Sequence, residues 1–542
     1  MRASKGEPAR GAARDRDRPL WIAAYVVTLA GAGAAVAAYR SIGGAGFPLD
    51  DSWIHLAFAD NLARGDGFGI NGGQPTPGAT SPLWVVLLAI GNLFGGGHDI
   101  WPRSLGTACL AACGILGVSL CRRLGLHAED NRVAPILAAV CGLSVVTCFP
   151  LVWSAAGAME PPLFGAMLLG TMLALSHKGD GSLKTAAIWG VSAGLTANAR
   201  PEGLLIIPLA AAADLLLGRG EPRLRLKRAA LGVLVAVALT LPYILFCLST
   251  TGRPFPNTYY AKTLSTRTTL PDPAYVVELV GLACQLAAEP MVGALLVFGA
   301  IALWLKSRDA AAPAAGLAFA IILPLSYATM ERSMLFAGGA GNLGRYLYPM
   351  FPPLIVLSFA ALGAIAQKLN ANGSRMWTPR AALLLAVIAV ASGIYRTARF
   401  SETYRMNVRE IDEMHVQMAA ILNERLPAGA LVAANDVGAL ACLTDLRVLD
   451  LVGIISTETL DILRPKNGTP PTDPDAALFE LMIQTRPDAI VIFRDWYPGL
   501  YARLRPGLHY ITEVTLQERF TAGGDRLEAY SIDWSRLERP AP

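Results

Sequence analysis

Long apolar runs separated by short polar segments dominate the first 400 positions of the chain. Runs of roughly 15–20 apolar residues have the length that a helix needs to cross a bilayer. The pattern therefore predicts a mainly α-helical, polytopic membrane protein with about 11 spans. The stretch 83–94 is apolar but short for a span, and we expect a juxtamembrane helix there. The expected spans lie near 20–39, 103–121, 133–150, 162–176, 185–198, 203–217, 229–248, 290–305, 311–329, 346–366 and 380–397.

The distribution of Lys and Arg between these runs sets the expected orientation. The tail 1–19 carries six basic residues against three acids, which favours a cytoplasmic N-terminus. If successive spans cross the membrane in opposite directions, the inner segments hold 15 Lys or Arg in 48 residues. The outer loops are more than twice as long in total and hold 8. Arg396 and Arg399, at the last outer exit, are exceptions. A cleaved signal peptide is an alternative reading of the N-terminus that would leave the remaining topology unchanged.

After the last span the apolar runs shorten and charged residues become dense. Leu431–Ala434 and Ala489–Phe493 have the pattern of short buried strands, and Asp475–Thr485 that of a helix. Asn435–Gly438 follows the first strand like a strand-to-helix turn with an Asx cap. These alternating signals predict a small α/β domain on the outer face. The expected organisation is a basic cytoplasmic tail (1–19), a transmembrane domain (20–398) and an extracytoplasmic α/β domain (399–542).

Composition supports this picture. The chain is 53% hydrophobic and 16% charged, with a mean hydropathy of +0.43, whereas soluble domains carry about 25% charged residues. The net charge of +5 is spread over short clusters and indicates no nucleic-acid partner. The eight cysteines show no metal-type Cys/His spacing, and Cys442 is the single cysteine of the tail. No metal site is predicted, although carboxylate binding of a divalent cation is left open.

The first outer loop, 40–81, contains the strongest chemical signal, the pair Asp50-Asp51. One of these carboxylates can accept a proton from a hydroxyl nucleophile, with the other or His55 tuning its pKa. The structural alternative is that the pair caps an amphipathic helix that begins near Ser52. Glycines and prolines after that helix predict a stiff, turn-rich loop.

Further charged and aromatic residues fall at the same predicted face, while the inner face shows only basic clusters expected to be solvated. This asymmetry favours a site for an anionic, lipid-linked ligand. Local ion pairs, snorkelling and aromatic-belt anchoring are the structural alternatives. The residues concerned are Glu160, Arg200, Glu202, Tyr259, Tyr260, Lys262, Arg345 and Tyr346.

Several motifs, in order along nearly the whole chain, resemble those of GT-C membrane glycosyltransferases. The similarity is greatest to the branch of the mycobacterial terminal arabinofuranosyltransferase. It is specific to the superfamily rather than to a sugar. The motifs are Asp50–Phe68 with Gly78–Trp84, Met159-Glu160, Ala199–Gly203, Pro256–Lys262, Gly344–Tyr346, Asn435–Ala439 and Asp450–Gly453.

The resemblance implies transfer of a sugar, with arabinofuranose as one candidate, from a polyprenyl-phosphate donor, with inversion at the anomeric carbon. The acceptor would be a cell-envelope glycan, glycolipid or protein, and the location a bacterial inner membrane. Asp51, or Asp50, would be the base. Arg200, Lys262 and Arg345 would bind the donor phosphate. The residues that would orient the sugar and the cations are His55, Glu160, Glu202, Tyr259, Tyr260 and Tyr346. The residues that would contact the acceptor are Asp436 and Asp450, unless Asp436 is only a helix cap.

Two other functional classes stay open: a transporter or flippase for lipid-linked glycans, and an assembly protein that keeps the fold without activity. A transporter more often has repeated halves and ionisable groups at mid-membrane depth, and the sequence indicates neither. Walker-type, dinucleotide-binding and zinc-protease motifs are absent from the sequence. The donor is therefore expected to arrive already activated.

Overall fold

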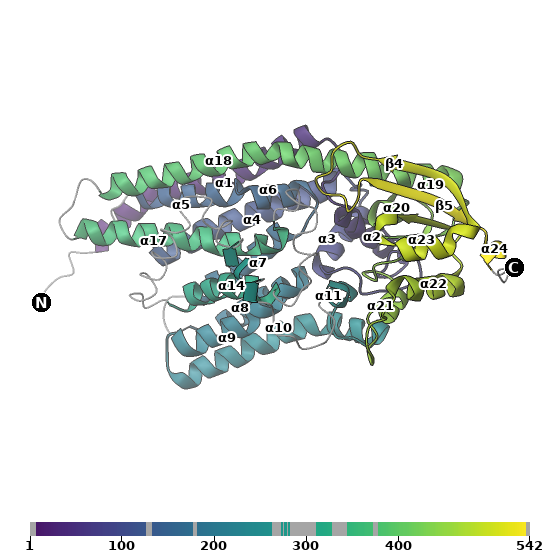
Figure 1. Ribbon diagram of the computed structural model, residues 1–542. Coiled ribbons are helices and arrows are strands. Elements are labelled where there is room, and N and C mark those ends of the chain that lie inside the picture. Colours follow the sequence, from purple (N-terminus) through teal and green to yellow (C-terminus); the bar gives the residue numbers. More distant parts are fainter. Residues whose placement is uncertain are drawn as a thin grey trace, which may run out of the picture.

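The computed structural model describes residues 7–125, 133–176, 181–262, 273–274, 276–278, 280–281, 310–327, 344–371 and 378–537. The predicted span near 290–305 lies outside them. Long helices run side by side as an elongated bundle, and a smaller mixed domain covers one end of it (Figure 1). The predicted class, a helical membrane protein with a small C-terminal α/β unit, is confirmed.

Most of the bundle consists of helices that follow the predicted apolar runs. In chain order they are α1 (Glu7–Gly43), α4 (Ile100–Gly125), α5 (Val133–Val146), α6 (Phe149–Ala156), α7 (Pro161–Leu175), α8 (Leu183–Ala199), α9 (Ile206–Leu217), α10 (Pro222–Thr251), α14 (Ala311–Ser326), α17 (Phe351–Ala371) and α18 (Thr378–Ile411).

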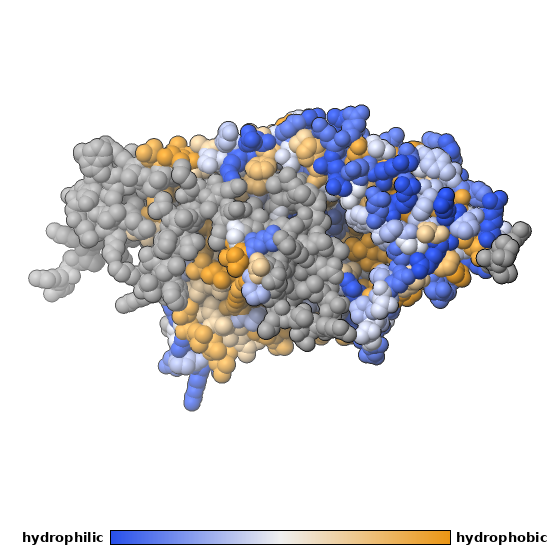
Figure 2. Space-filling model, in the orientation of Figure 1, coloured by the Kyte–Doolittle hydropathy of each residue, from blue (hydrophilic) through white to orange (hydrophobic). Residues whose placement is uncertain are grey.

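Within the described residues, four helical segments are long and apolar enough to cross a membrane. They are Arg18–Gly43, Ile100–Leu124, Pro222–Thr251 and Arg345–Ala364. A fifth span is formed if Ala134–Val146 and Phe149–Ala156, bent by 52°, count as one. Their exposed side chains are largely apolar, and Figure 2 shows the hydrophobic colours concentrated on the helical part of this face. The chain is a multi-pass membrane protein.

Small residues allow the backbones of α8 and α10 to approach each other closely. A Cβ added at Gly232 would lie 1.9 Å from Trp189 Cζ2, and one at Gly190 would lie 2.5 Å from Gly232 O. A methyl group at either position therefore requires the helices to separate. Small residues at such contacts let helix backbones approach closely in a membrane.

One expectation about the inner face is wrong. Arg228, in the predicted basic segment 219–228, lies within α10 and is fully buried rather than solvated. Its Nη2 donates to Asp214 Oδ1 of α9 at 2.6 Å. The buried guanidinium is stable there because the carboxylate neutralises its charge. The buried pair joins α9 to α10.

The first loop forms two short helices at the end of the bundle that faces the mixed domain (Figure 1). The predicted amphipathic helix is α2, Asp50–Arg64, and it ends at Gly65, whose φ of 85° suits glycine. The helix expected over 83–94 is α3, Pro82–Leu93. Between them the loop folds back on itself, because Thr76 N donates to Phe68 O at 2.9 Å.

The mixed domain contains one five-stranded sheet in the order β2-β1-β3-β5-β4. Parallel pairing joins β1 (Leu431–Ala434) to β2 (Arg447–Asp450) and β3 (Ala489–Ile492). Antiparallel pairing adds β5 (Arg526–Ile532) and β4 (Leu508–Thr515). The sequence predicted β1 and β3 because fully buried strands form short continuous apolar runs.

Helices surround this sheet and connect it to the bundle. The predicted helix over 475–485 is α22, Pro474–Thr485. The expected domain boundary at 399 falls inside α18, which runs from the bundle into the mixed domain (Figure 1). The remaining described helices of the domain are η4 (Asp412–Val416), α19 (Gln417–Arg425), α20 (Gly438–Leu443), α21 (Thr457–Leu463), η5 (Arg494–Trp496), α23 (Pro498–Leu504), η6 (Arg505–Gly507) and α24 (Trp534–Leu537).

Candidate functional site

The Asp51 carboxylate lies beside a guanidinium that comes from a distant part of the chain. Arg345 Nη1 donates to Asp51 Oδ2 at 2.9 Å. Asp51 lies in the first turn of α2, and Arg345 begins η3, Arg345–Met350, directly after Gly344 with its φ of 64°. Asp51 keeps 39% of its side-chain surface exposed. Its carboxylate is thus held in place without being closed off.

Charge keeps the Asp51 carboxylate ionised. Burial raises its pKa, but the positive charges of Arg345 and Lys262 outweigh that effect and hold the pKa well below its usual range. His55 lowers the pKa further. An aspartate in this state is a proton acceptor at neutral pH and not a proton donor.

Two cations converge on one phenol next to Asp51. Lys262, the last residue of α11 (Asn257–Lys262), donates from Nζ to Tyr346 OH at 3.1 Å. Arg345 Nη2 donates to the same oxygen at 3.4 Å. The charges also lie over the ring of Tyr346, with Lys262 Nζ at 5.7 Å and Arg345 Cζ at 5.2 Å from its centroid. The aromatic face stabilises two cations at close range.

A second group of ionic contacts surrounds Arg200, at the start of η1 (Pro201–Leu205). Arg200 Nη1 donates to Glu160 Oε1 at 2.5 Å, and its Nη2 donates to Glu202 Oε1 at 2.9 Å. Burial raises the pKa of Glu160, but the charge of Arg200 dominates and lowers it to about 2. His55 Nε2 lies 3.4 Å from Glu160 Oε2. This buried guanidinium is therefore shared by two carboxylates.

Two residues connect the groups around Asp51 and Arg200. His55 follows Asp51 by one turn of α2, so the two side chains leave the same face of the helix. Tyr327 donates its hydroxyl to Glu202, and its ring packs against Tyr346 with centroids 5.5 Å apart. Tyr327 was not predicted as a site residue, because a tyrosine at the end of an apolar run is indistinguishable in sequence from a membrane-interface anchor.

Eight predicted site residues therefore form one continuous network at the end of the bundle. Within it, three buried polar atoms have no hydrogen-bond partner among the residues that the structure describes: Arg345 Nε, His55 Nδ1 and Glu160 Oε2. Buried polar atoms normally have a partner, so these three are candidates for ligand contacts. The network consists of Asp51, His55, Glu160, Arg200, Glu202, Lys262, Arg345 and Tyr346.

Tyr259 and Tyr260 share the short helix α11 with Lys262. Their rings contact each other with centroids 5.2 Å apart, and Tyr259 also packs against Phe255 at 5.1 Å. Arg253 lies over the ring of Tyr260 at 4.9 Å. Tyr259 keeps 43% of its surface exposed. This aromatic group extends from the α11 helix.

Asp50 faces away from Asp51 and binds the mixed domain. Its Oδ2 accepts from Gly438 N at 2.6 Å and its Oδ1 from Ala439 N at 2.8 Å, at the start of α20. The structural alternative, in which the pair caps α2, is thus wrong, because the helix begins at Asp50 and neither aspartate caps it. The expected Asx cap of α20 is wrong too, since a residue of the first loop fills that role.

The two acids expected to contact an acceptor have local partners. Asp436 Oδ2 lies 3.1 Å from His415 Nε2 and accepts from Asn435 Nδ2 at 3.0 Å, so Asp436 is not a helix cap. Asp450 is buried and accepts from Val452 N and Ile455 N, and burial raises its pKa to about 6. Asp436 keeps 29% of its side-chain surface exposed, so a further partner can reach it.

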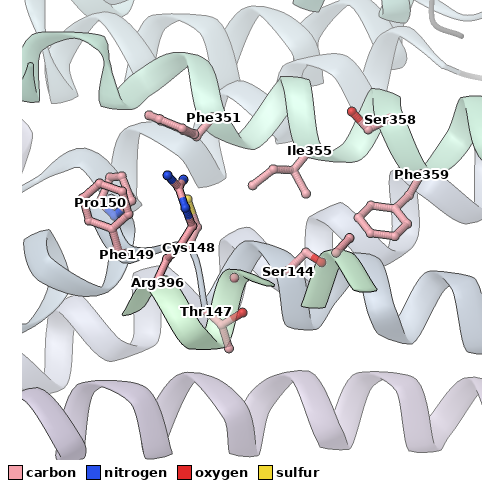
Figure 3. A pocket seen from close by; sticks show the side chains of 12 residues that line it. Ser144, Thr147, Cys148, Phe149, Pro150, Phe351, Ile355, Ser358, Phe359 and Arg396 are labelled. Atoms are coloured by element: carbon pink, nitrogen blue, oxygen red, sulfur yellow. The ribbon is translucent and has the colours of Figure 1, made fainter. Parts of the chain in front are cut away.

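A cavity between α5, α17 and α18 does not belong to this network. Figure 3 shows its apolar lining by Phe149, Ile355 and Phe359, with Arg396 at one side. Its volume is about 60 Å³. A cavity of about 150 Å³ can bind benzene, and this one, at less than half that volume, does not enclose a sugar.

The fold that holds this site is shared with solved structures. The described architecture is similar to that of ArnT from Cupriavidus metallidurans bound to undecaprenyl phosphate, with a TM-score of 0.62 and 14% identity. The match covers 95% of this chain and 99% of that chain. Apo ArnT of the same organism gives a TM-score of 0.59 and 15% identity, with 96% and 99% covered.

Other comparisons add less. An oligosaccharyltransferase from Archaeoglobus fulgidus, tethered to an acceptor peptide, gives a TM-score of 0.49 and 14% identity over 92% of this chain and 74% of that chain. A family model described as a domain of unknown function, DUF8728, matches residues 404–532. No curated protein matches the sequence.

Proposed function

We propose that this protein is an inverting glycosyltransferase of the extracytoplasmic face, which moves a sugar from a polyprenyl-phosphate donor to a hydroxyl of a cell-envelope acceptor. The observation that carries the proposal is the ionised Asp51 beside Arg345 and Lys262, in a fold like that of ArnT. A base next to two cations suits a reaction in which a hydroxyl loses a proton and a phosphate leaves. Arabinofuranose is the sugar that the sequence resemblance suggests.

In the proposed reaction the acceptor oxygen attacks the anomeric carbon while the bond from that carbon to the phosphate oxygen breaks. Asp51 takes the proton of the acceptor hydroxyl. The electron pair of the broken bond stays on polyprenyl phosphate, whose charge Arg345 and Lys262 stabilise. The leaving phosphate needs no proton, so one base is sufficient.

The Asp51–Arg345 contact gives the donor a second role. An aspartate whose pKa is strongly lowered is a weak base. A donor phosphate that binds Arg345 neutralises part of its charge and so raises the pKa of Asp51. In this proposal the carboxylate gains proton affinity when the donor is bound.

The second ionic group positions the sugar. His55 Nδ1 is buried without a partner among the described residues and is available to a sugar hydroxyl. Glu160 and Glu202 fix Arg200, so Arg200 acts on the donor from a preset position. Tyr259, Tyr260 and Tyr346, on α11 and η3, contact the sugar in this proposal. Asp436 is the better candidate of the two tail acids for acceptor contact, because Asp450 is buried.

The test is release of polyprenyl phosphate from lipid-linked pentoses and hexoses by the purified protein, with and without envelope acceptors. Asp51→Asn should reduce acceptor-dependent release by about 10²–10⁴-fold. Asp66→Asn, which changes an exposed acid paired with Arg64, is the matched control. Release by Asp51→Asn at the wild-type rate would refute the proposed base. Transbilayer movement of the lipid without bond cleavage would instead identify a flippase, and neither reaction would identify an assembly protein.

A further inference from the structure

A carboxylate, an imidazole and a thiol meet at the joint between the bundle and the mixed domain. They come from three separate segments: Asp60 from α2, His98 from the turn between α3 and α4, and Cys442 from α20. One ligand atom from each residue can be chosen so that all three lie within 4.8 Å of one another. The separation in sequence explains why no metal-type spacing is visible in the chain.

The three side chains lie close enough for a metal ion of the zinc type, and because His98 faces Asp60 and Cys442 with different ring nitrogens, a small turn of the ring directs one nitrogen at the ion. His98 Nε2 lies 2.8 Å from Asp60 Oδ2, and Cys442 Sγ lies 4.0 Å from that same oxygen. Cys442 Sγ also lies 4.0 Å from His98 Nδ1. Zinc binds sulfur at about 2.3 Å and nitrogen or oxygen at about 2.0–2.2 Å, so its ligand atoms lie roughly 3–4 Å apart.

Neighbouring residues hold the three side chains in orientation. Asn92 Nδ2 donates to Asp60 Oδ1 at 2.7 Å, which leaves Oδ2 facing the cluster. The ring of Trp53 packs edge-on against His98 with centroids 6.4 Å apart. Asp50 fixes the start of α20 and thereby the position of Cys442. Metal sites depend on such outer contacts to orient their ligands.

The cluster is accessible to an ion. A polar cavity of about 470 Å³ is lined by Asp60, Arg64, Cys442 and Asp445, among others. The side chains of His98 and Asp60 are 34% and 17% exposed. The cavity gives an entry path and room for a water molecule as fourth ligand, as in zinc sites with three protein ligands.

We propose that Asp60, His98 and Cys442 form a binding site for one Zn²⁺ ion that fastens the mixed domain to the first loop and the turn before α4. The mixture of thiolate, imidazole and carboxylate favours Zn²⁺ over Mg²⁺ or Ca²⁺, which prefer oxygen ligands alone. Binding displaces the thiol proton, and the thiolate and carboxylate together balance the charge of the ion. The site is independent of the proposed glycosyl transfer.

The test uses the full-length protein in detergent after chelator treatment, with Zn²⁺ and Co²⁺ as probes. We expect one Zn²⁺ per chain by elemental analysis and a thiolate-to-Co²⁺ charge-transfer band after cobalt addition. Cys442→Ser and His98→Asn should lose both signals. His509→Asn is the matched control, because His509 also lies near a carboxylate of the mixed domain, Asp533, but outside the cluster.

A measurement on the unmodified protein covers the case in which a variant fails to fold. Zn²⁺ should slow alkylation of Cys442 at least tenfold, as read from its peptide by mass spectrometry, and should raise the melting temperature. Retention of no Zn²⁺, together with unchanged Cys442 alkylation, would overturn the proposal. Stoichiometric Zn²⁺ that survives both Cys442→Ser and His98→Asn would also overturn it.

Discussion

The carboxylate of Asp50 accepts two backbone N–H groups at the start of α20, the nearer from Gly438 at 2.6 Å, although the two residues lie 388 positions apart. The next residue, Asp51, faces the opposite way and binds Arg345. Two consecutive acids therefore have separate roles. One attaches the mixed domain to the first loop, and the other is the candidate base.

Asp51→Asn should reduce the rate of sugar transfer by about 10²–10⁴-fold, the usual contribution of a general base. An amide keeps the size of the side chain but cannot accept the proton. The melting temperature should change little, because Asp51 is partly exposed. Single-turnover transfer from a lipid-linked sugar measures the effect, with Asp66→Asn alongside. A loss of folding equal to the loss of rate would instead assign Asp51 a structural role.

Asp50→Ala should weaken the attachment of the mixed domain by about 1–2 kcal/mol, the range for loss of a helix cap. Gly438→Ala should act at the same contact, because a Cβ there would lie 2.1 Å from the backbone oxygen of Asp50. Hydrogen exchange at the amides of Gly438 and Ala439 measures both effects. Gly33→Ala is the control, since a Cβ at that position meets nothing within 4 Å. Unchanged exchange in both variants would contradict the attachment.

Arg345→Gln should shift the acid limb of the rate profile to higher pH. The proposed base must be ionised, so the rate falls as pH drops through the pKa of Asp51. Arg345 holds that pKa well below its usual range, and its removal allows the pKa to rise. The rate at neutral pH should also fall by about 10²–10³-fold through lost phosphate stabilisation. Arg405→Gln, at an exposed arginine paired with Glu402, is the control. An acid limb that stays at its wild-type pH would show that Arg345 does not control the ionisation of Asp51.

Asp450 should make the mixed domain more stable in mild acid. Burial raises its pKa in the folded state to about 6, above the unfolded value near 3.8. The stabilising contribution is therefore complete below pH 3.8 and is lost as pH rises through 6, on the order of 3 kcal/mol in total.

Local hydrogen exchange at Val452 and Ile455, whose amides bind Asp450, follows this change between pH 4 and 7 after correction for intrinsic rates. In Asp450→Asn the dependence should disappear, because the side chain no longer titrates. A wild-type domain whose local stability is level over this range would contradict the raised pKa.

Much of the architecture was predictable because it follows from local patterns. Apolar runs indicated the helices, and the buried runs at 431–434 and 489–492 indicated two central strands. The caps were predicted wrongly, because a capping rule considers neighbours in sequence and the cap of α20 comes from Asp50. Arg228 was misjudged for a related reason, since its partner Asp214 lies on the preceding helix.

The candidate site was predictable as a set of residues and not as a geometry. Charged residues at the ends of apolar runs indicated Asp51, Arg200 and Arg345, but no spacing rule shows that Arg345 reaches Asp51 across 294 positions. Tyr327 and the Asp60–His98–Cys442 cluster carried no recognisable signal, because the fold alone brings their segments together.

The adjacency of Asp50 and Asp51 restricts how such a protein can be rebuilt. A chimera that exchanges only residues 404–532 would place a foreign helix against Asp50. If that helix does not fit, Asp50 moves, and Asp51 moves with it because the two residues are consecutive. A chimera that works must therefore also take the first turn of α2 from the protein that supplies the mixed domain. The first loop and the mixed domain meet at this contact and have to be inherited as a matched pair.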